Sequence, residues 1–131
     1  MQAETARRVE FKSVAPSFVV SDVLSTAEYY RDVLGFEILG YFAEPPVFAM
    51  AARGGVEIHF GKADAELQPS NLEFREISSD AYIWVDDVEA LFAELTASGA
   101  DIIEGPTQRI YNCVEMEVRD FNGFKLVFSQ G

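Results

Sequence analysis

Two stretches of the chain repeat the same switch from strand to helix, and this repeat constrains the fold more than any other feature. In residues 80–85 apolar and polar positions alternate, which is the period of a β-strand. Over residues 88–95 apolar side chains recur at helical spacing, and Gly99 ends the pattern. Residues 19–23 read like residues 84–88, so the same unit begins twice. We therefore expect two copies of one supersecondary unit.

The two predicted helices carry sequence signals at their ends. The first helix is expected over about residues 25–34, with a capping box that begins at Ser25 and a stop at Gly35. The second follows Asp86 and Asp87, and either carboxylate can cap its first turn.

Strands account for most of the remaining chain. Residues 55–60 resemble residues 123–128, so each copy closes with a similar strand. The expected strands lie near residues 11–20, 37–42, 47–52, 56–61, 80–85, 101–104, 112–119 and 124–129. The predicted fold class is therefore α+β. Two βαβββ modules form a curved, incompletely closed β-sheet with the helices on its outer face.

The length of 131 residues predicts a single domain over residues 1–131. Module one is expected at about residues 11–61 and module two at about residues 80–130. Residues 62–79 lack a clear period and are interpreted as the linker between the modules. A linker of this length often acts as a lid over a site.

The charge of the chain excludes one class of partner. Ten basic against 22 acidic residues give a net charge of −12. Nucleic acid is therefore not expected as a partner, because a phosphate backbone requires a basic surface. No apolar run is long enough for a membrane span, and residues 1–12 lack the apolar centre of a signal peptide. Cys113 is the single cysteine, which favours a cytoplasmic location.

Several short motifs occur in an order that is typical of one superfamily. They are Val20-Ser21-Asp22-Val23, Tyr30-Arg31-Asp32-Val33-Leu34-Gly35-Phe36, Trp84-Val85-Asp86-Asp87-Val88 and Arg119-Asp120-Phe121-Asn122-Gly123-Phe124-Lys125-Leu126-Val127-Phe128. Together with the two βαβββ copies, they make roughly residues 12–130 resemble the vicinal oxygen chelate superfamily. That superfamily includes glyoxalase I, extradiol dioxygenases and bleomycin-resistance proteins, so the resemblance implies a fold and leaves several chemistries open.

The resemblance also implies where a metal site would lie. Metal-binding members of the superfamily place His, Gln or Glu at four equivalent strand positions, two in each module. The equivalent residues here are Ala15, His59, Asp80 and Val127. Ala15 and Val127 cannot ligate a metal, and a register shift that brings in Ser13 or Ser17 does not complete the set. We therefore expect no metal and no cofactor, as in the metal-free bleomycin-resistance-like members.

Strand alternation gathers aromatic and polar side chains on the concave face. The expected ligand-binding residues are Glu57, His59, Asp80, Tyr82, Trp84, Glu115 and Glu117. Rings and carboxylates together favour a flat or cationic ligand, through stacking and cation–π contacts. Two structural interpretations stay open. Tyr82 and Trp84 could fill the concavity of the sheet, and Glu115 and Glu117 could lie on a solvated face.

His59 is the only histidine and the candidate catalytic residue, because an imidazole can act as a general base near neutral pH. The alternative is a pocket residue that is hydrogen-bonded to Glu57, two residues away on the same strand face. Cys113 is expected in the core, with a nucleophile as the other interpretation.

The predicted function is metal-free binding of a small molecule, for which the resemblance suggests an antibiotic. Whether the protein is an enzyme stays open. The alternative is a lyase, isomerase or dioxygenase of the same superfamily, either metal-dependent or using His59 with a carboxylate. A third possibility is a fold without any ligand.

The resemblance further implies a homodimer, because members commonly pair modules from two chains around a ligand cleft. Open sheet edges also favour a two-fold dimer. Tyr82 and Trp84 would then lie in a cleft that the linker at residues 62–79 of a second chain helps to close. Pro16 offers the monomeric alternative, because a proline can protect a sheet edge.

Overall fold

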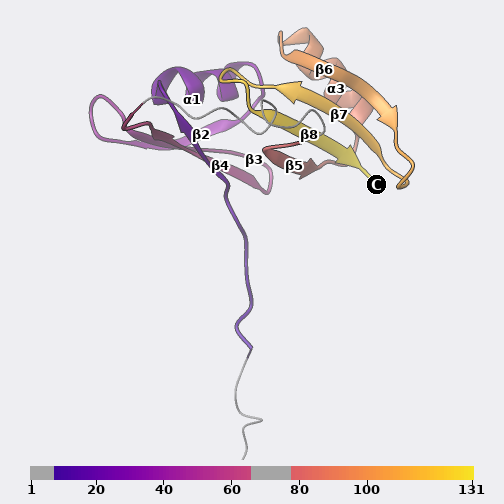
Figure 1. Ribbon diagram of the computed structural model, residues 1–131, viewed down its shortest axis with the longest axis horizontal. Helices are drawn as coiled ribbons and strands as arrows, with labels where there is room; N and C mark the ends of the chain where they lie inside the picture. Colours follow the sequence, from indigo (N-terminus) through magenta and orange to yellow (C-terminus); the bar gives the residue numbers. More distant parts are fainter. Residues whose placement is uncertain (1–7, 66–77) are drawn as a thin grey trace, which may run out of the picture.

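The computed structural model describes residues 8–65 and 78–131, and it shows two modules side by side (Figure 1). The first contains β1 (Ser17–Val20), α1 (Val23–Asp32), β2 (Glu37–Phe42), β3 (Phe48–Arg53) and β4 (Val56–Lys62). The second contains β5 (Ala81–Trp84), α3 (Val88–Ala97), β6 (Asp101–Gln108), β7 (Val114–Arg119) and β8 (Lys125–Gln130). Both modules have the predicted order β-α-β-β-β.

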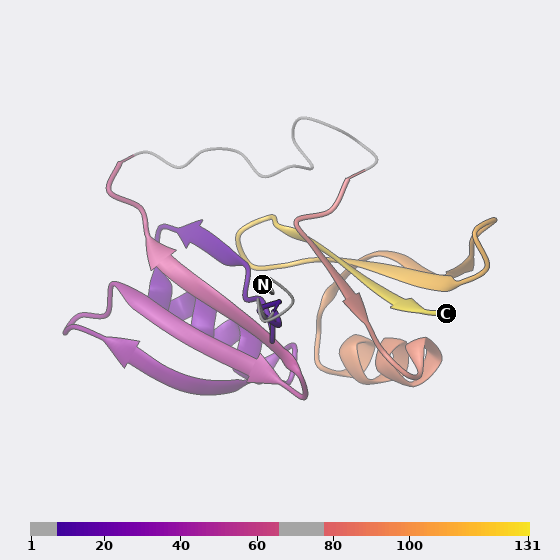
Figure 2. The same cartoon turned by 90° about the horizontal axis from the view of Figure 1, so that it is seen from below.

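Each module folds into a four-stranded mixed sheet that carries one helix (Figure 2). The strand orders are β1-β4-β3-β2 and β5-β8-β7-β6, so the two sheets have the same topology. In each sheet the first strand pairs in parallel with the last, and the other neighbours are antiparallel. Helix α1 packs on β2, β3 and β4, and α3 packs on β6, β7 and β8. The predicted fold class is confirmed.

Both helices begin at an aspartate. Asp22 has an extended backbone, and its carboxylate accepts the Ser25 N–H at 2.9 Å. The predicted capping box at Ser25 is wrong, because Ser25 already lies in the first turn and donates its hydroxyl to Asp22 at 3.0 Å. Asp87 caps α3 in the same way, through the Ala90 N–H at 2.9 Å. A carboxylate at this position also interacts favourably with the helix dipole.

Apolar side chains between each sheet and its helix form the core. Ile58 and Phe60 of β4 are fully buried, and so are Met116 and Val118 of β7. Strand alternation predicts this burial, because these residues point to the helix-covered face. The other face of each sheet therefore remains open for the polar side chains.

A ring stack and a buried hydrogen bond join the two modules. Phe18 of β1 stacks on Phe124 with the ring centroids 4.3 Å apart. The Tyr30 hydroxyl of α1 donates to the Asp120 carboxylate at 2.7 Å. Burial raises the pKa of the Asp120 carboxyl and holds the pKa of Tyr30 well above its ordinary value. The turn between β7 and β8 is thereby fixed against the first module.

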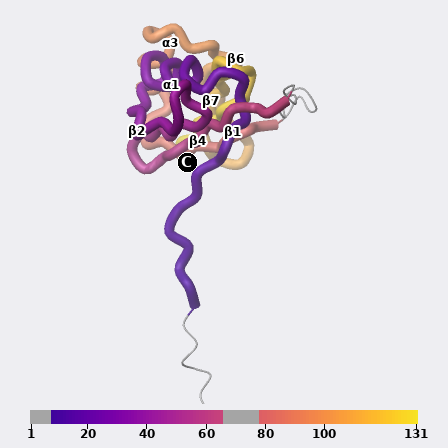
Figure 3. Tube along the Cα trace, turned by 90° about the vertical axis from the view of Figure 1, so that its left-hand side faces the viewer, coloured from indigo at the N-terminus to yellow at the C-terminus, as the bar shows by residue number. Residues whose placement is uncertain are grey.

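The first strand is shorter than the predicted segment at residues 11–20. Its pairing with β4 begins at Pro16, whose carbonyl accepts the His59 N–H at 2.9 Å. Residues 8–15 run away from the body of the protein (Figures 1 and 3), and the Phe11 side chain is 93% exposed. A favourable strand pattern is not enough to form a strand here, because no strand among the described residues completes the hydrogen bonds of residues 8–15.

Strand β6 is longer than predicted, because it continues past residues 101–104 to Gln108. The predicted segment ended before Gly105 and Pro106. Instead, the ladder with β7 shifts register twice between Ile102 and Thr107. Such irregularities are tolerated because β6 is an edge strand, where a proline does not break a central ladder.

Candidate functional site

The open face of the second sheet contains a hollow with a volume of about 800 Å³. Its lining residues are Ser78, Ser79, Tyr82, Ile103, Glu104, Arg109, Tyr111, Glu115, Glu117, Lys125 and Val127. All of them belong to the second module, except Ser78 and Ser79, which lie just before β5. One module therefore supplies every wall of this hollow in the described part of the chain.

Strand register brings the polar groups of the hollow together. In the ladder of β7 with β8, Glu115 lies opposite Ser129 and Glu117 lies opposite Val127. Tyr82 of β5 pairs with Val127 from the other side of β8. Because these residues share a sheet face, side chains from three neighbouring strands converge on one space.

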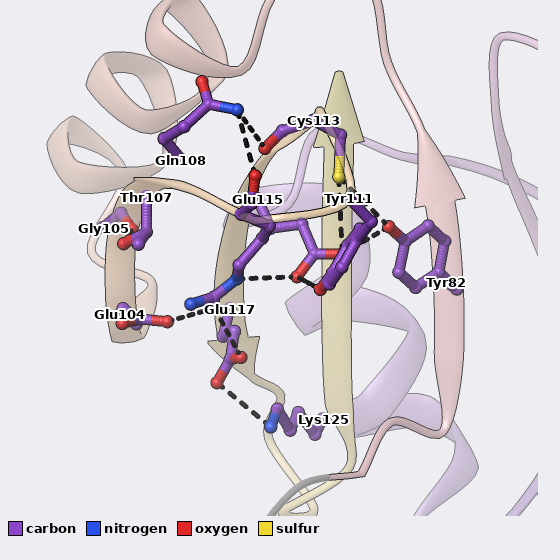
Figure 4. A network of polar contacts seen from close by, with 11 residues as sticks. Tyr82, Glu104, Gly105, Thr107, Gln108, Tyr111, Cys113, Glu115, Glu117 and Lys125 are labelled. Carbon is purple, nitrogen blue, oxygen red and sulfur yellow. Dashed lines mark hydrogen bonds and ion pairs between the residues drawn. The ribbon is translucent and has the colours of Figure 1, made fainter. Parts of the chain in front are cut away.

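Glu115 lies at the centre of the polar network (Figure 4). The residue is only 4% exposed, yet its carboxylate accepts hydrogen bonds from three O–H and N–H donors, and a longer one, at 3.9 Å, from Cys113 Sγ. Tyr82 is one donor, the Tyr111 hydroxyl is the second at 2.8 Å, and Arg109 Nε is the third at 3.0 Å. Burial alone would raise the pKa of Glu115, but these donors outweigh it and lower the pKa. The hollow thus contains a buried, ionised carboxylate.

Tyr82 combines a polar and an aromatic contact. Partial burial, together with the hydrogen bond to Glu115, raises the pKa of Tyr82 to about 12. The phenol therefore remains protonated and donates at neutral pH. Its ring lies 4.9 Å from the ring of Trp84, which is 72% exposed beside the hollow. Together the two rings offer an aromatic surface next to a fixed negative charge.

Arg109, from the turn after β6, ties the remaining carboxylates to Glu115. One of its Nη2 hydrogen bonds goes to Glu104, and another goes to Glu117 at 3.2 Å. Hydrogen bonds to Glu104 and then to Glu115 raise the pKa of the guanidinium above its ordinary value. The sequence pattern did not indicate Arg109 as a site residue, because a turn has no period that fixes where a side chain points.

Lys125 of β8 is the second base in the hollow. It is 4% exposed, and its Nζ lies 3.0 Å from Glu117 Oε1 (Figure 4). Lys125 precedes Val127 by two residues on the same strand face, which is a signal that could have identified it. With Arg109 it opposes Glu104, Glu115 and Glu117, so two positive and three negative charges leave a net charge of −1.

The structure places two predicted ligand-binding residues away from this hollow. Glu57 and His59 lie on β4, on the open face of the first sheet. His59 Nε2 is 2.5 Å from Glu57 Oε2, so the predicted pairing of the two is present. The Phe48 ring packs edge-on against the imidazole, with the centroids 5.4 Å apart. Neither Glu57 nor His59 lines the hollow of the second sheet.

Asp80 lies at the foot of β5. Its Oδ2 accepts the backbone N–H of Lys125 at 2.8 Å, and the Asp80 N–H donates to the Lys125 carbonyl at 2.8 Å. These contacts hold the start of β5 against β8. Asp80 thus helps to position β5, the strand that carries Tyr82 into the hollow.

Strand pairing places residues other than Ala15 and Asp80 beside His59 and Val127. Ser17, not Ala15, lies beside His59 in the parallel ladder of β1 with β4. By the same pairing Tyr82 lies beside Val127. Serine, valine and a tyrosine that donates to a carboxylate do not fit a divalent metal. Within residues 8–65 and 78–131, no group of three or more His, Cys, Asp or Glu side chains could hold a metal ion.

Comparison of the sequence with known protein families identifies the family of this chain. Residues 11–128 match the Glyoxalase/Bleomycin resistance protein/Dioxygenase superfamily. The chain belongs to this superfamily. No curated protein matches it at a significant level. The predicted resemblance to the vicinal oxygen chelate proteins is therefore confirmed.

Solved structures with the same fold include a bleomycin-binding protein and a bleomycin resistance determinant. The bleomycin-binding protein of Streptomyces verticillus, complexed with copper(II)-bleomycin, is 24% identical with a TM-score of 0.72, and the match covers 95% of this chain and 99% of that one. TioX from Micromonospora sp. ML1 is 20% identical with a TM-score of 0.73, covering 92% and 98%. A bleomycin resistance determinant encoded on transposon Tn5 gives the same four values. At these identities the comparison establishes the fold.

Neither helix in the described residues is long and apolar enough to cross a membrane.

Proposed function

We propose that this protein binds a small, flat molecule with a cationic group and releases it unchanged, as expected for a member of the bleomycin-resistance type. The observation that carries the proposal is the ionised Glu115, buried in the hollow beside the rings of Tyr82 and Trp84. A cation gains most from a carboxylate that water cannot fully screen, and a flat ring gains from stacking on exposed aromatic side chains.

The hydrogen bonds made by the tyrosine hydroxyl groups favour binding over catalysis in the hollow. Tyr82 and Tyr111 both donate to Glu115, and Arg109 is tied to the same carboxylate. None of the three is positioned as a nucleophile or as a base. Ser78 Oγ is buried and has no partner among the described residues, so it can offer a hydrogen bond to a ligand. An antibiotic is the first class of ligand to test, because two relatives of the same fold bind or resist bleomycin.

We further propose that two chains form a homodimer in the cytoplasm and share each binding site. The open face of the first sheet carries Glu57 and His59 together with exposed apolar side chains. Val19 is 56% exposed and Phe42 is 68% exposed on that face. If this face of one copy covers the hollow of the other, all of the predicted ligand-binding side chains of the two sheets meet in one cleft. The linker at residues 62–79, proposed as a lid, falls mostly outside the described residues.

A second candidate function rests on the short contact between Glu57 and His59. A carboxylate at 2.5 Å from Nε2 can orient an imidazole for general base catalysis. In a shared cleft this pair would face a ligand bound by the other copy. The candidate reaction class is that of a lyase, isomerase or dioxygenase. Turnover that is lost in H59A but retained in Y82F would favour it.

The proposed binding function is tested by thermal shift and calorimetry. Bleomycin and a panel of cationic aromatic compounds are added to the full-length protein, and neutral compounds with the same rings serve as controls. We expect cationic compounds to raise the melting temperature and to be recovered unchanged after incubation. A panel that leaves the melting temperature unchanged, or that shows no preference for cations over the matched neutral compounds, would contradict the proposal.

A further inference from the structure

Arg109 already fills the acidic part of the hollow as an internal cation. Its Nε donates to Glu115 at 3.0 Å, and its Nη2 donates to Glu117 at 3.2 Å and to Glu104. One guanidinium is therefore surrounded by carboxylates from β6 and β7. A guanidinium or amidinium group has the planar fork of donors that suits this arrangement. A ligand with such a group would need the space and the acceptors that Arg109 now holds.

Arg109 lies on an exposed turn and not within a strand. It follows the last residue of β6, and the turn that carries it closes through the Arg109 N–H on the Cys113 carbonyl at 2.8 Å. Its neighbours in the turn lie in solvent, since Ile110 is fully exposed and Tyr111 is 61% exposed. By contrast, Lys125 lies within β8 and is 4% exposed. Arg109 is thus carried by an exposed turn, whereas Lys125 is held within a buried strand.

The charge of the hollow depends on where Arg109 lies. With Arg109 inside, two bases oppose three glutamates and the net charge is −1. Without it, Lys125 alone opposes the same three glutamates and the net charge is −2. Charges in such a partly buried site are weakly screened, so this difference changes the attraction for a cation strongly.

We propose that Arg109 is the specificity-determining residue of the site, because it competes with the cationic group of the ligand for the same carboxylates. The inference rests on the proposed binding function. A small cation alone gains little by displacing Arg109, since one ion pair replaces another. A ligand that also stacks on Tyr82 and Trp84 gains the additional ring contacts. The site therefore selects molecules that join a flat ring to a planar cation.

Benzamidine, a flat ring with an amidinium group, is the probe for this competition, and benzamide is its neutral control. Calorimetry compares the wild type with R109Q, which removes the charge, and R109K, which keeps it. We expect R109Q to bind benzamidine about tenfold more tightly than the wild type, while R109K stays near the wild type and benzamide binding changes little. Equal or weaker benzamidine binding by R109Q would overturn the proposal, since Arg109 would then assist the ligand or play no part.

Two further measurements test the competition without comparing the benzamidine affinities of the variants. In R109A, low-millimolar guanidinium chloride should raise the melting temperature relative to the same concentration of sodium chloride, because free guanidinium can replace the lost side chain. The wild type should show no such difference. In the wild type, saturation with benzamidine should speed hydrogen exchange at residues 109–113, because the turn is displaced. If neither the stabilisation by guanidinium nor the faster hydrogen exchange is observed, the proposed competition between Arg109 and the ligand would be overturned.

The outcomes also separate this proposal from the function on which it rests. A guanidinium effect in R109A, with no cationic aromatic compound bound by any variant, supports the cation subsite and counts against ligand binding as the function. Tight binding of cationic aromatic compounds that is unchanged in R109Q and R109K supports the function and overturns the role of Arg109.

Discussion

The phenol of Tyr82 reaches across β8 from the edge strand β5 to the carboxylate of Glu115 on β7. This hydrogen bond links the aromatic part of the hollow to its charged part. It also fixes the Tyr82 ring against Trp84, because the phenol oxygen is held at one end and the ring contact at the other. Aromatic surface and negative charge are therefore presented to a ligand as one rigid unit.

The first prediction concerns the hydrogen bonds of Glu115. Y82F leaves the buried carboxylate with two of its three O–H and N–H donors, beside the longer contact from Cys113 Sγ, so we expect a loss of about 1–2 kcal/mol in the free energy of unfolding. Y111F should cost less, because Tyr111 is 61% exposed and water can replace its hydroxyl. Urea denaturation measures both. A loss in Y111F that equals or exceeds the loss in Y82F would contradict this order.

The second prediction follows from the lowered pKa of Glu115. Its folded pKa lies below the ordinary value of 4.5, so ionised Glu115 stabilises the fold above that value. The contribution is lost as the pH falls through the folded pKa. We expect the difference in free energy of unfolding between the wild type and E115Q to be constant near neutral pH and to shrink in acid. A difference that grows on acidification would contradict the prediction.

The third prediction concerns Asp120, whose contribution to stability should change with pH in the opposite direction to that of Glu115. Burial raises the pKa of Asp120 above its ordinary value of 3.8, so its contribution to stability is full below that value and is lost as the pH rises through the folded pKa. We expect the difference between the wild type and D120N to grow on acidification. In D120N the amide oxygen can still accept the backbone N–H groups of Asn122 and Phe124, and the amide nitrogen can donate to the Tyr30 hydroxyl, which makes D120N a conservative comparison. If the difference in free energy of unfolding from the wild type changes in the same direction with pH for D120N and for E115Q, the change would come from the effect of acid on the whole protein and would contradict the prediction.

The repeat in the sequence was sufficient to predict the fold. Alternation placed Ile58, Phe60 and the other inward side chains correctly, because burial against a helix imposes a period of two on a strand. The same rule placed Tyr82 and Glu115 on one face. It failed at the first strand, where Phe11 continues the apolar pattern but pairs with no strand in the described part of the chain.

The site was only partly predictable, for two physical reasons. Arg109 reaches the hollow from a turn, and turn side chains follow no period that a sequence reveals. Glu57 and His59 share the predicted alternation, but alternation says only that they lie on an open face. It does not say which open face they meet, because that depends on how modules pack within one chain or between two chains.

The fourth prediction tests the contact between modules. F18A removes a ring that is 5% exposed and stacks on Phe124 at 4.3 Å, so we expect a loss of about 3–5 kcal/mol in the free energy of unfolding. F18L fills most of the space and should cost about 1 kcal/mol. Denaturation followed by the fluorescence of the single tryptophan, Trp84, and by far-ultraviolet circular dichroism should give coincident transitions in the wild type. In F18A, separate transitions would reveal modules that unfold independently.

The last prediction concerns the proposed dimer. Val19 and Phe42 lie on the open face of the first sheet and are 56% and 68% exposed, so a charge there would oppose burial against a second copy. We expect sedimentation of the wild type to give about twice the chain mass of 14.6 kDa, and V19D and F42D to give a monomer. L24D is the matched control, because Leu24 is 42% exposed on α1 of the same module, away from that face. V19D and F42D should also weaken bleomycin binding while L24D does not, since only the first two remove the second copy from the cleft. A wild-type species near 14.6 kDa at micromolar concentration would rule out the shared cleft and leave the hollow of the second module as the whole site.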